Sequence, residues 1–500
     1  MRPYFVNKAR RTEAWSRNTR QVQLRQLRFL LESAGSTEFG KAHGFAGILA
    51  ADDVAKAYTD AVECVEYEDI RESVERMLRG ERDVLWRGLT CNFAQSSGTS
   101  GGKSKYIPIT DDSLRLNHYK GGADSVAHYL NLCPESRLFD GKALILGGSF
   151  ANEVTEKHRR AKVGDLSATL IDRINPLANI VRVPPKKIAL MSDWTEKLPL
   201  MVEACRKANV TNISGVPSWM GVLLRQVLAS EGAESLAQVW RNLEVFFHGG
   251  ISFTPYRKEY ERLTAGLGNM RYLENYNASE GFFAMQDDFS DPAMLLLIDG
   301  GIFYEFKPLD GGEPLPAWEV EAGRCYELLI SACNGLWRYS PGDTVMVNSV
   351  DPVKITVAGR TRSYINAFGE ELMEWNAEKG VAEACEATGA SIANYTVAPL
   401  FATSKEKGRH QWIVEWNREP VSMERFAEVL DAALQGVNSD YQAKRGGDIF
   451  LAKPEIITVP AGTFDKWLHT TGSGKLGGQR KIPRLSNDRR VADAVLGMIH

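Results

Sequence analysis

The chain has 500 residues, more than one hydrophobic core usually supports, so we expect two or more domains. Its apolar fraction of 44% and charged fraction of 25% are typical of a soluble globular protein, and its net charge of −3 gives no electrostatic basis for binding nucleic acid or an anionic membrane. The seven cysteines are scattered without Cys-x-x-Cys spacing and the eight histidines lack metal-ligand spacing, which favours free thiols in a reducing cytoplasm and no zinc site.

The first predicted element is an amphipathic helix over residues 12–34. Its apolar residues recur at helical spacing, and Gly35 stands where a C-terminal cap is common. The residues before it are basic and polar rather than apolar, so they do not predict a secretory signal. Apolar runs such as 294–298 are too short to span a bilayer.

The next segment is the most informative one in the sequence. It reads Ser96, Ser97, Gly98, Thr99, Ser100, Gly101, Gly102, Lys103, Ser104 and Lys105. Glycines let backbone N–H groups approach a ligand, hydroxyl groups donate hydrogen bonds and lysines neutralise charge, which together suit the phosphates of ATP. A flexible Ser/Gly linker is the alternative, but a linker rarely ends in lysines and continues into a predicted strand at 106–109.

This segment does not fit a Walker A loop. The first glycine of that motif would fall at Ser97, and the residues after Lys105 are β-branched or proline, which does not predict the helix that a Walker A loop opens. We therefore predict a flap between two strands that clasps ATP, and we disfavour a P-loop kinase.

Strand-like and helix-like segments alternate between about 140 and 350, which predicts α/β layers with largely parallel sheets. The predicted strands are 143–146, 211–214 and 243–247, and the predicted helices are 197–207 and 219–228. Later strands at 302–306, 325–330 and 344–350 have little helix between them and predict an antiparallel part.

Residues 359–362 interrupt this pattern and predict a hinge. Beyond it the sequence predicts a compact α+β unit with helices at 370–388 and 423–434 and strands at 392–398, 411–416 and 455–459. The predicted fold is α/β, with a large N-terminal domain of layered sheets and helices (1–360) and a small C-terminal α+β domain (361–500).

Two further segments could bind a nucleotide, and each also has a simpler interpretation. Gly249 and Gly250 follow the strand at 243–247, where the crevice beyond the strand ends could admit a flat base, although a strand-to-loop turn explains them equally well. In the segment 274–281, Tyr276 can stack on a base, Ser279 can reach a phosphate and Glu280 can hold Mg²⁺ together with the phosphates. Taken alone, Glu280 is more often a solvated loop carboxylate.

Two later segments also carry candidates. Asp343 follows Pro341-Gly342 and could accept hydrogen bonds from ribose hydroxyls, although a plain Pro-Gly turn is the commoner case. Lys475 and Lys481 lie in a glycine-rich strip, 472–484, that could reach over a neighbouring active site. The strip matches G-x-G-x-x-G, but too little chain follows for a βαβ unit, so we reject dinucleotide binding.

Taken in order, these motifs resemble the adenylate-forming superfamily of acyl-CoA synthetases and firefly luciferase. They resemble more closely the auxin-responsive-promoter (Gretchen Hagen) family of acyl-acid amido synthetases, as a bacterial-type member. Residues 96–108 match its Ser-Ser-Gly-Thr-Ser-Gly-Gly…Lys…Ile-Pro signature, and 479–484 resemble its Gln-Tyr-Lys-Thr-Pro-Arg. Residues 276–280 stand at its Tyr-Ala-Ser-Ser-Glu and 342–343 end its Tyr-Arg-Val-Gly-Asp.

The chain departs from these patterns at three places. Asn277-Ala278 replaces the middle of the first motif, Ser340-Pro341 replaces Arg-Val in the second, and Arg362 stands in the hinge where Asp or Lys is usual. The position of the hinge is therefore better supported than its chemistry.

The resemblance implies a reaction in two steps. A carboxylic acid attacks the α-phosphate of Mg-ATP to give an acyl-adenylate and pyrophosphate. The mobile C-terminal domain then rotates, and an amine, typically an amino acid, attacks the carbonyl to give an amide and AMP. The first step needs charge neutralisation at the α-phosphate, which suits Mg²⁺ and a mobile lysine. The motif match assigns Lys481 to this role, with Lys475 as the second candidate.

The resemblance also assigns binding roles. Residues 96–101 and Lys105 would hold the β- and γ-phosphates, Glu280 the Mg²⁺ and Asp343 the ribose. Tyr276, with Gly249 and Gly250, would hold the adenine. Ser214, Gly215, Val216 and Pro217 stand where the superfamily borders its acyl pocket.

Three alternatives remain at this point. A coenzyme A thioester ligase shares the first step and differs only in the second nucleophile. A DNA-binding regulatory protein is disfavoured by the net charge and by the lack of a basic recognition helix. A catalytically inactive scaffold is disfavoured because Lys105, Glu280, Asp343 and Lys481 are all present. The expected partners are a small carboxylic acid and an amine, with no nucleic acid and no membrane.

Overall fold

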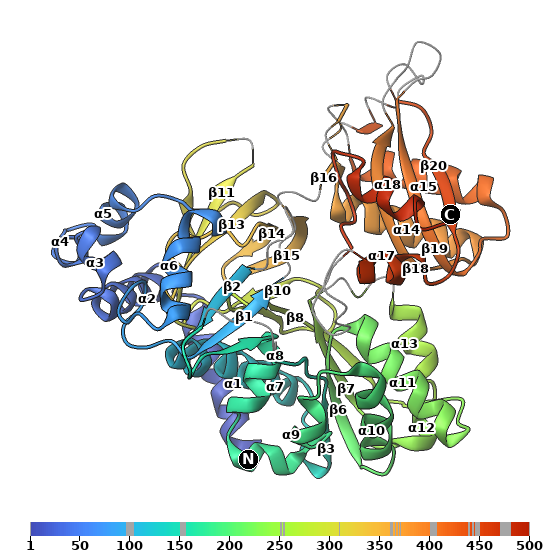
Figure 1. The fold of residues 1–500 in the computed structure, drawn as a ribbon, viewed down its shortest axis with the longest axis horizontal. Coiled ribbons are helices and arrows are strands. Elements are labelled where there is room, and N and C mark those ends of the chain that lie inside the picture. Colours follow the sequence, from blue (N-terminus) through green and yellow to red (C-terminus); the bar gives the residue numbers. More distant parts are fainter. Residues whose placement is uncertain are drawn as a thin grey trace.

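The computed structural model describes most of the chain (Figure 1). The described residues are 2–96, 105–150, 157–250, 253, 256–309, 311–360, 364–365, 367–368, 370, 372–400, 408–438, 441–442, 445, 451–470 and 482–499.

A twelve-stranded mixed sheet occupies the centre of the N-terminal region, in the order β12-β11-β13-β14-β15-β10-β9-β8-β7-β6-β3-β5. The strands are β3 (Lys142–Ile145), β5 (Arg182–Val183), β6 (Val210–Gly215), β7 (Val245–Gly249), β8 (Arg271–Asn277), β9 (Phe282–Gln286), β10 (Met294–Leu296), β11 (Ile302–Pro308), β12 (Leu315–Pro316), β13 (Cys325–Ala332), β14 (Asp343–Val350) and β15 (Val353–Arg360). Strands β5, β3, β6, β7 and β8 are parallel, and the strands from β9 to β12 along the sheet pair antiparallel. The predicted α/β class, with a parallel half and an antiparallel half, is confirmed.

Helices cover both faces of the parallel half of the sheet. Side chains alternate along each strand, so neighbouring residues of one strand pack against helices on opposite faces. Phe246 packs under α10 (Trp194–Arg206), α11 (Pro217–Glu231) and α13 (Arg257–Leu263), whereas its neighbour Phe247 packs under α7 (Tyr119–Leu132). The shorter helices of this region are α8 (Leu166–Arg173), α9 (Lys186–Ala189) and α12 (Leu236–Val239).

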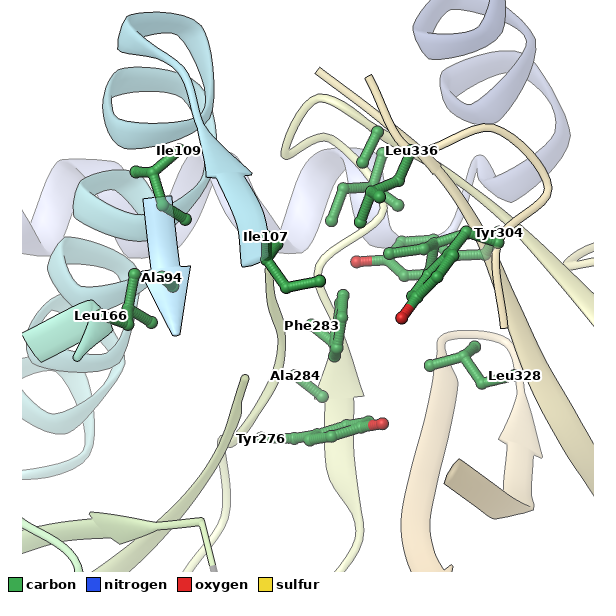
Figure 2. Close-up of a cluster of buried hydrophobic side chains, with 14 of the residues drawn as sticks. Ala94, Ile107, Ile109, Leu166, Tyr276, Phe283, Ala284, Tyr304, Leu328 and Leu336 are labelled. Carbon is green, nitrogen blue, oxygen red and sulfur yellow. The ribbon is translucent and has the colours of Figure 1, made fainter. Parts of the chain in front are cut away.

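A small sheet, β2-β1-β4, packs against the antiparallel half. It contains β1 (Asn92–Ser96), β2 (Lys105–Ile109) and β4 (Lys162–Gly164). Figure 2 shows Ile107 of this sheet directed toward Phe283 and Tyr304, which belong to the same apolar core cluster. In β1 and β2, Ser96 pairs with Lys105 in an antiparallel ladder, so the segment between them connects two strands as predicted and does not open a helix.

The N-terminal helical prediction was only partly correct. The single helix expected at 12–34 is two helices, α1 (Arg2–Ser16) and α2 (Thr19–Ala34), because Asn18 adopts a non-helical conformation (φ −120°, ψ 45°). Gly35 does follow α2, but it keeps a right-handed conformation (φ −59°) rather than a left-handed cap. Four further helices follow: α3 (Glu38–Ala42), α4 (Phe45–Leu49), α5 (Val54–Ala61) and α6 (Tyr67–Arg79).

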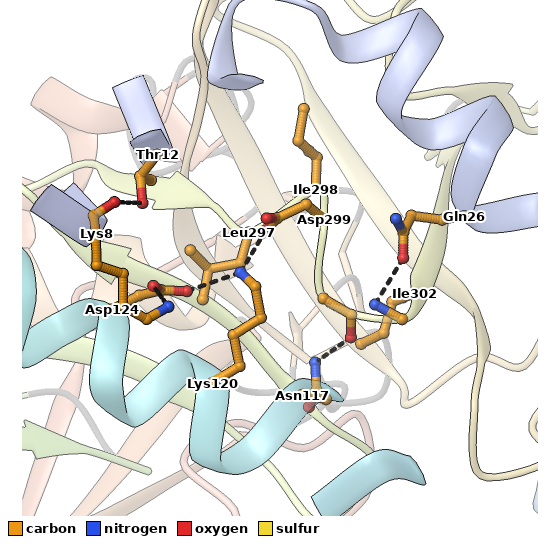
Figure 3. Close-up of polar contacts among 12 residues, drawn as sticks. Lys8, Thr12, Gln26, Asn117, Lys120, Asp124, Leu297, Ile298, Asp299 and Ile302 are labelled. Carbon is orange, nitrogen blue, oxygen red and sulfur yellow. Dashed lines mark hydrogen bonds and ion pairs between the residues drawn. The ribbon is translucent and has the colours of Figure 1, made fainter. Parts of the chain in front are cut away.

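Ion pairs to the buried Asp124 hold α1 against α7 (Figure 3). The Asp124 carboxylate contacts both Lys8 and Lys120, and Lys120 also donates to Asp299 at 2.6 Å. On α2, Gln26 accepts a hydrogen bond from the backbone N–H of Gly301 at 2.9 Å. These bonds fix the N-terminal helices to the loop between β10 and β11.

The C-terminal region contains a three-stranded sheet with its own apolar core. Its elements are β16 (Tyr364–Ile365), β17 (Leu372–Met373), α14 (Glu374–Thr388), β18 (Ser391–Leu400), β19 (Arg409–Arg418), α15 (Met423–Val437), β20 (Glu455–Val459), α17 (Thr463–Thr470) and α18 (Arg490–Leu496). The helix expected at 370–388 begins four residues later, at Glu374. Within the described part of the chain, no helix is both long and apolar enough to cross a bilayer.

Candidate active site

Three of the predicted binding segments lie at one edge of the sheet. Strands β6, β7 and β8 are parallel neighbours and end at Gly215, Gly249 and Asn277. The segments 214–217, 249–250 and 276–280 therefore meet at the carboxyl edge, where ligands bind in open α/β sheets.

The contact between Tyr276 and Asp343 joins two motifs that lie 67 residues apart. The Tyr276 hydroxyl donates a hydrogen bond to Oδ2 of Asp343 at 2.6 Å. Tyr276 is 8% exposed and Asp343 is 7% exposed, and the tyrosine ring packs edge-on against Phe283 with the ring centroids 4.8 Å apart. The residues predicted for adenine and for ribose are thus brought together, although base stacking on Tyr276 stays a prediction.

The turn before Asp343 is held by a buried ion pair. Arg338 has a left-handed backbone conformation (φ 41°), and its guanidinium contacts Glu305 at 2.9 Å. The same guanidinium donates to the carbonyl oxygens of Thr59 at 3.0 Å and Val62 at 2.7 Å. These contacts therefore fix the backbone at Arg338, five residues before Asp343.

Two amide side chains fix the loop that carries Ser279 and Glu280. Asn117 accepts a hydrogen bond from the backbone N–H of Phe282 at 2.6 Å and donates to its carbonyl oxygen at 3.0 Å, and Asn334 donates to the carbonyl oxygen of Glu280 at 3.2 Å. Ser279 is buried and Glu280 is half-buried. Sequence reasoning missed both asparagines because neither lies in a motif.

A half-buried carboxylate on a fixed loop suits Mg²⁺, which commonly binds through one or two carboxylates and substrate phosphates. Among the described residues, no three His, Cys, Asp or Glu side chains gather as a metal site. Glu280 therefore fits the predicted role only together with phosphate oxygens.

The two glycines after β7 have structural reasons to be glycine. A Cβ on Gly249 would lie 2.1 Å from the carbonyl oxygen of Asn275 on β8. Gly250 has φ +83°, which side chains disfavour. A strand-to-loop turn therefore accounts for both glycines, and their contact with adenine stays a prediction.

The predicted acyl-pocket segment begins at the end of β6. Ser214, Gly215 and Val216 are half-buried, and Pro217 is the first residue of α11, where its carbonyl oxygen accepts a hydrogen bond from Tyr260 at 2.6 Å. A Cβ on Gly215 would lie 3.2 Å from Leu146, which follows β3. This segment is thus packed against the next strand of the same edge.

The interior beside β8 shifts two titratable groups. Burial raises the pKa of Glu274 to about 7, although the Arg257 charge opposes the shift. On β7, burial lowers the pKa of His248 to about 3, and the Arg257 charge lowers it further. His248 stacks on Phe253 with ring centroids 4.1 Å apart, so it is a neutral core residue.

The phosphate-loop residues and the candidate lysines lie mostly outside the described part. This applies to Ser97, Gly98, Thr99, Ser100, Gly101, Lys475 and Lys481, and to the side chain of Ser96. Lys105 is described, and its ammonium group lies 5.6 Å from the centre of the Tyr67 ring. The tyrosine hydroxyl accepts a hydrogen bond from the N–H of Tyr106 at 2.7 Å, which fixes the end of the loop.

The chain directly after Lys481 is anchored on the C-terminal sheet. Thr396 donates to the carbonyl oxygen of Pro483 at 2.7 Å, and the backbone N–H of Val397 donates to that of Arg484 at 2.8 Å. Arg484 also stacks on the Tyr395 ring at 4.5 Å. The described part of the 472–484 strip thus runs beside β18.

Comparison with known protein families identifies the family of this chain. The GH3 family N-terminal domain matches residues 8–268, the central domain matches 295–360 and the C-terminal domain matches 375–490. This chain belongs to the GH3 family. The first of these matches alone covers more than half of the chain.

Plant members of the GH3 family align over nearly the whole length. The "Probable indole-3-acetic acid-amido synthetase GH3.1" of Arabidopsis thaliana is 22% identical over 95% of this chain and 90% of its own. The "Indole-3-acetic acid-amido synthetase GH3.8" of Oryza sativa subsp. indica is 23% identical over 96% and 90%.

Solved structures establish the fold. The "GH3.15 acyl acid amido synthetase" superposes with a TM-score of 0.77 and 18% identity over 98% of this chain and 95% of its own. A 2-hydroxyisobutyryl-CoA ligase in the postadenylation state superposes with a TM-score of 0.61 and 12% identity, over 95% and 91%. The chain thus has the adenylate-forming fold that its motifs predict.

Proposed function

We propose that this GH3 family member is an ATP-dependent acyl-acid amido synthetase that adenylates a carboxylic acid and transfers the acyl group to an amine. The contact between Tyr276 and Asp343 is the observation that carries the proposal. It joins the motif that contains Glu280 to the turn that carries Asp343, the candidate ribose ligand, at the carboxyl edge of the sheet. One nucleotide can bind both motifs only if they lie side by side in this way.

In the first step, a substrate carboxylate oxygen bonds to the α-phosphorus of ATP while the bond to pyrophosphate breaks. Asp343 would accept hydrogen bonds from the ribose hydroxyls, held in place by the Tyr276 hydroxyl. Residues 96–105 would enclose the β- and γ-phosphates from the flap between β1 and β2. Glu280 would hold Mg²⁺, which when bound neutralises charge on the phosphates.

In the second step, the amine nitrogen bonds to the acyl carbon, AMP leaves and the nitrogen loses a proton. Lys481, with Lys475 as the alternative, would serve the first step from a rotating C-terminal domain, residues 361–500. The anchoring of Pro483 and Arg484 beside β18 supports a fixed position of this strip on that domain. The amide product, rather than a thioester, rests on the family and on the names of its members.

The test is an acid-dependent exchange of pyrophosphate into ATP, followed by mass analysis of products formed with mixed amino acids. We expect exchange with a subset of carboxylic acids and release of AMP and pyrophosphate with an acyl-amino acid. Release of ADP and phosphate would disprove adenylation. A thioester formed with coenzyme A, in the absence of any amide, would replace the amido synthetase by a thioester ligase.

A further inference from the structure

The turn before Asp343 contains a polar contact that the proposed function does not use. The Ser340 hydroxyl donates a hydrogen bond to Oε1 of Glu327 at 2.5 Å, and its oxygen accepts one from the backbone N–H of Gly342 at 3.1 Å. Ser340 is 9% exposed, and Glu327 lies half-buried on β13. Because Gly342 directly precedes Asp343, Ser340 holds the backbone next to the carboxylate assigned to the ribose.

The two bonds of the Ser340 hydroxyl depend on each other. A hydroxyl group has one proton and two lone pairs, so donating that proton to Glu327 leaves the lone pairs for the N–H of Gly342. Since the acceptor is a carboxylate, this bond is stronger than one between two neutral groups. Glu327 therefore sets the orientation of the hydroxyl that holds Gly342.

The backbone up to Ser340 is anchored by bonds of its own. The N–H of Ser340 donates to the carbonyl oxygen of Val65 at 2.9 Å, and Tyr339 exchanges two backbone hydrogen bonds with Ile330 of β13, at 2.8 and 2.9 Å. Gly342 has φ +82°, a left-handed conformation that favours glycine. The Ser340 side chain thus carries the anchoring of the turn across the next residue to this glycine.

Asp343 is thereby held through its side chain and through its backbone. The Tyr276 hydroxyl donates to Oδ2 at 2.6 Å, and Ser340 holds the peptide group before it. A carboxylate that accepts hydrogen bonds from a ribose has to be oriented, because hydrogen bonds weaken steeply with angle. Ser340 and Pro341 stand where the family pattern has Arg-Val, so this bonding belongs to the turn as this chain builds it.

We propose that Ser340 and Glu327 are positioning residues that hold Asp343 in the orientation that accepts the ribose hydroxyls of ATP. Both residues act on the nucleotide through Gly342 and the Asp343 backbone. Their loss should weaken recognition of the ribose hydroxyls and leave the contacts with the phosphates and with the acid unchanged. This inference rests on the proposed adenylation and on the ribose role of Asp343.

The test compares ATP with 2′,3′-dideoxy-ATP, which lacks both hydroxyls, in the pyrophosphate exchange assay with one accepted acid. We expect the wild type to show at least about a tenfold higher kcat/KM for ATP. Ser340→Ala and Glu327→Met should each lower this ratio at least about threefold, with kcat/KM for the dideoxy nucleotide unchanged. The double variant should lose little more than either single variant, because the two side chains act through the same bonds.

Two further variants serve as controls. Glu327→Gln keeps an oxygen that can accept the Ser340 proton and should retain most of the ratio. Thr356→Ala removes a hydroxyl on β15 that donates to Oδ1 of Asn348 at 2.7 Å, and it should leave the ratio unchanged. Thermal unfolding shows which variants are folded, and either Ser340→Ala or Glu327→Met alone decides the result.

The outcomes separate this inference from the proposed function. Absence of exchange with every acid would disprove adenylation itself. Exchange with equal kcat/KM for the two nucleotides in the wild type would refute the ribose role and this inference with it. A ratio that survives both Ser340→Ala and Glu327→Met, or an equal fall of kcat/KM for both nucleotides in these variants, would overturn the positioning role and leave adenylation intact.

Discussion

At the residue scale, the hydrogen bond from the Tyr276 hydroxyl to the Asp343 carboxylate is the central contact of the candidate site. Tyr276 and Asp343 were each predicted to contact the nucleotide, but their mutual hydrogen bond was not predictable, since nothing in the sequence relates residues 67 positions apart. The same holds for Asn117 and Asn334, which fix the Glu280 loop from distant elements. A motif identifies the residues that can contact a ligand. The residues that hold them in place do not belong to any motif.

Replacement of Asp343 tests the ribose assignment. Asp343→Ala removes hydrogen bonds between the ribose and an ionised acceptor, so we expect ATP binding to weaken by about 1.5–3 kcal/mol, or about ten- to a hundredfold in Kd, by calorimetry. Tyr276→Phe should weaken binding less, because it only loosens the carboxylate. Glu280→Ala should abolish exchange.

Tyr304→Phe is the matched control, since the Tyr304 hydroxyl bonds only weakly to a backbone carbonyl, at 3.4 Å, within the described residues. Equal ATP affinity of the wild type and Asp343→Ala would refute the ribose role.

The half-buried Glu274 predicts a pH effect on stability. Burial raises its pKa from 4.5 to about 7, so the folded protein keeps this proton at a pH where the unfolded chain has lost it. Its contribution to stability is complete below about pH 4.5 and is lost as the pH rises toward 7, by at most about 3 kcal/mol. Glu274→Gln should therefore gain stability relative to the wild type between pH 4.5 and 7.5, in urea unfolding.

The exposed Glu32 supplies the comparison. Glu32→Gln should change the free energy of unfolding by the same small amount at pH 4.5 and at pH 7.5. A Glu274→Gln difference that does not vary with pH would contradict the shifted carboxyl.

At the scale of elements, most helices and strands follow from periodicity, and the failures have local causes. The strands expected at 143–146, 211–214 and 243–247 are present within two residues, because apolar runs bounded by turn residues persist in the core. The break between α1 and α2 was missed because the apolar spacing continues through it. The π-helical turn at 113–118 was also invisible, since one extra residue per turn leaves no periodic signal.

The turn between β13 and β14 depends on the pair Arg338–Glu305. Because their side chains are 5% and 1% exposed, Arg338→Met leaves a buried carboxylate alone and should lower the free energy of unfolding by about 3–5 kcal/mol. Adding Glu305→Leu should recover part of that loss, since no buried charge then remains. Urea unfolding measures both.

An exposed ion pair gives the reference. Lys56→Met breaks the exposed pair with Asp60 and should change the free energy of unfolding little. If Arg338→Met costs no more than this, the buried pair does not hold the turn.

At the scale of the whole molecule, the adenylate-forming fold was predictable because four ordered motifs span the chain. The family and fold are confirmed by the domain matches and the superposed structures. The division at residue 360 and the rotation of the C-terminal domain stay predictions. Contacts between the two regions, such as Lys258 with Glu386 at 3.9 Å, could not be deduced from any local pattern.

The rotation predicts different effects of Lys481→Ala on the two half-reactions. A lysine on a rotating domain reaches the α-phosphate in only one orientation, so the variant should lose pyrophosphate exchange. It should still convert a synthetic acyl-adenylate and an amine to amide at nearly the wild-type rate. Single-turnover product analysis measures the second step.

Lys475→Ala is the matched control and should behave like the wild type in both assays. Selective loss of exchange in Lys475→Ala would transfer the role to that lysine. Equal slowing of both steps by Lys481→Ala would exclude its assignment to the first step.

The pairing of Asp343 with Arg360 has a mechanical consequence. Asp343 begins β14 and Arg360 ends β15, and the two residues lie opposite each other in the antiparallel ladder. The predicted hinge at 359–362 therefore starts one residue pair from the carboxylate assigned to the ribose. Torque transmitted through the predicted hinge would act on the strand that begins with Asp343, so the predicted ribose contact and the predicted pivot would move as a single lever rather than as two independent parts.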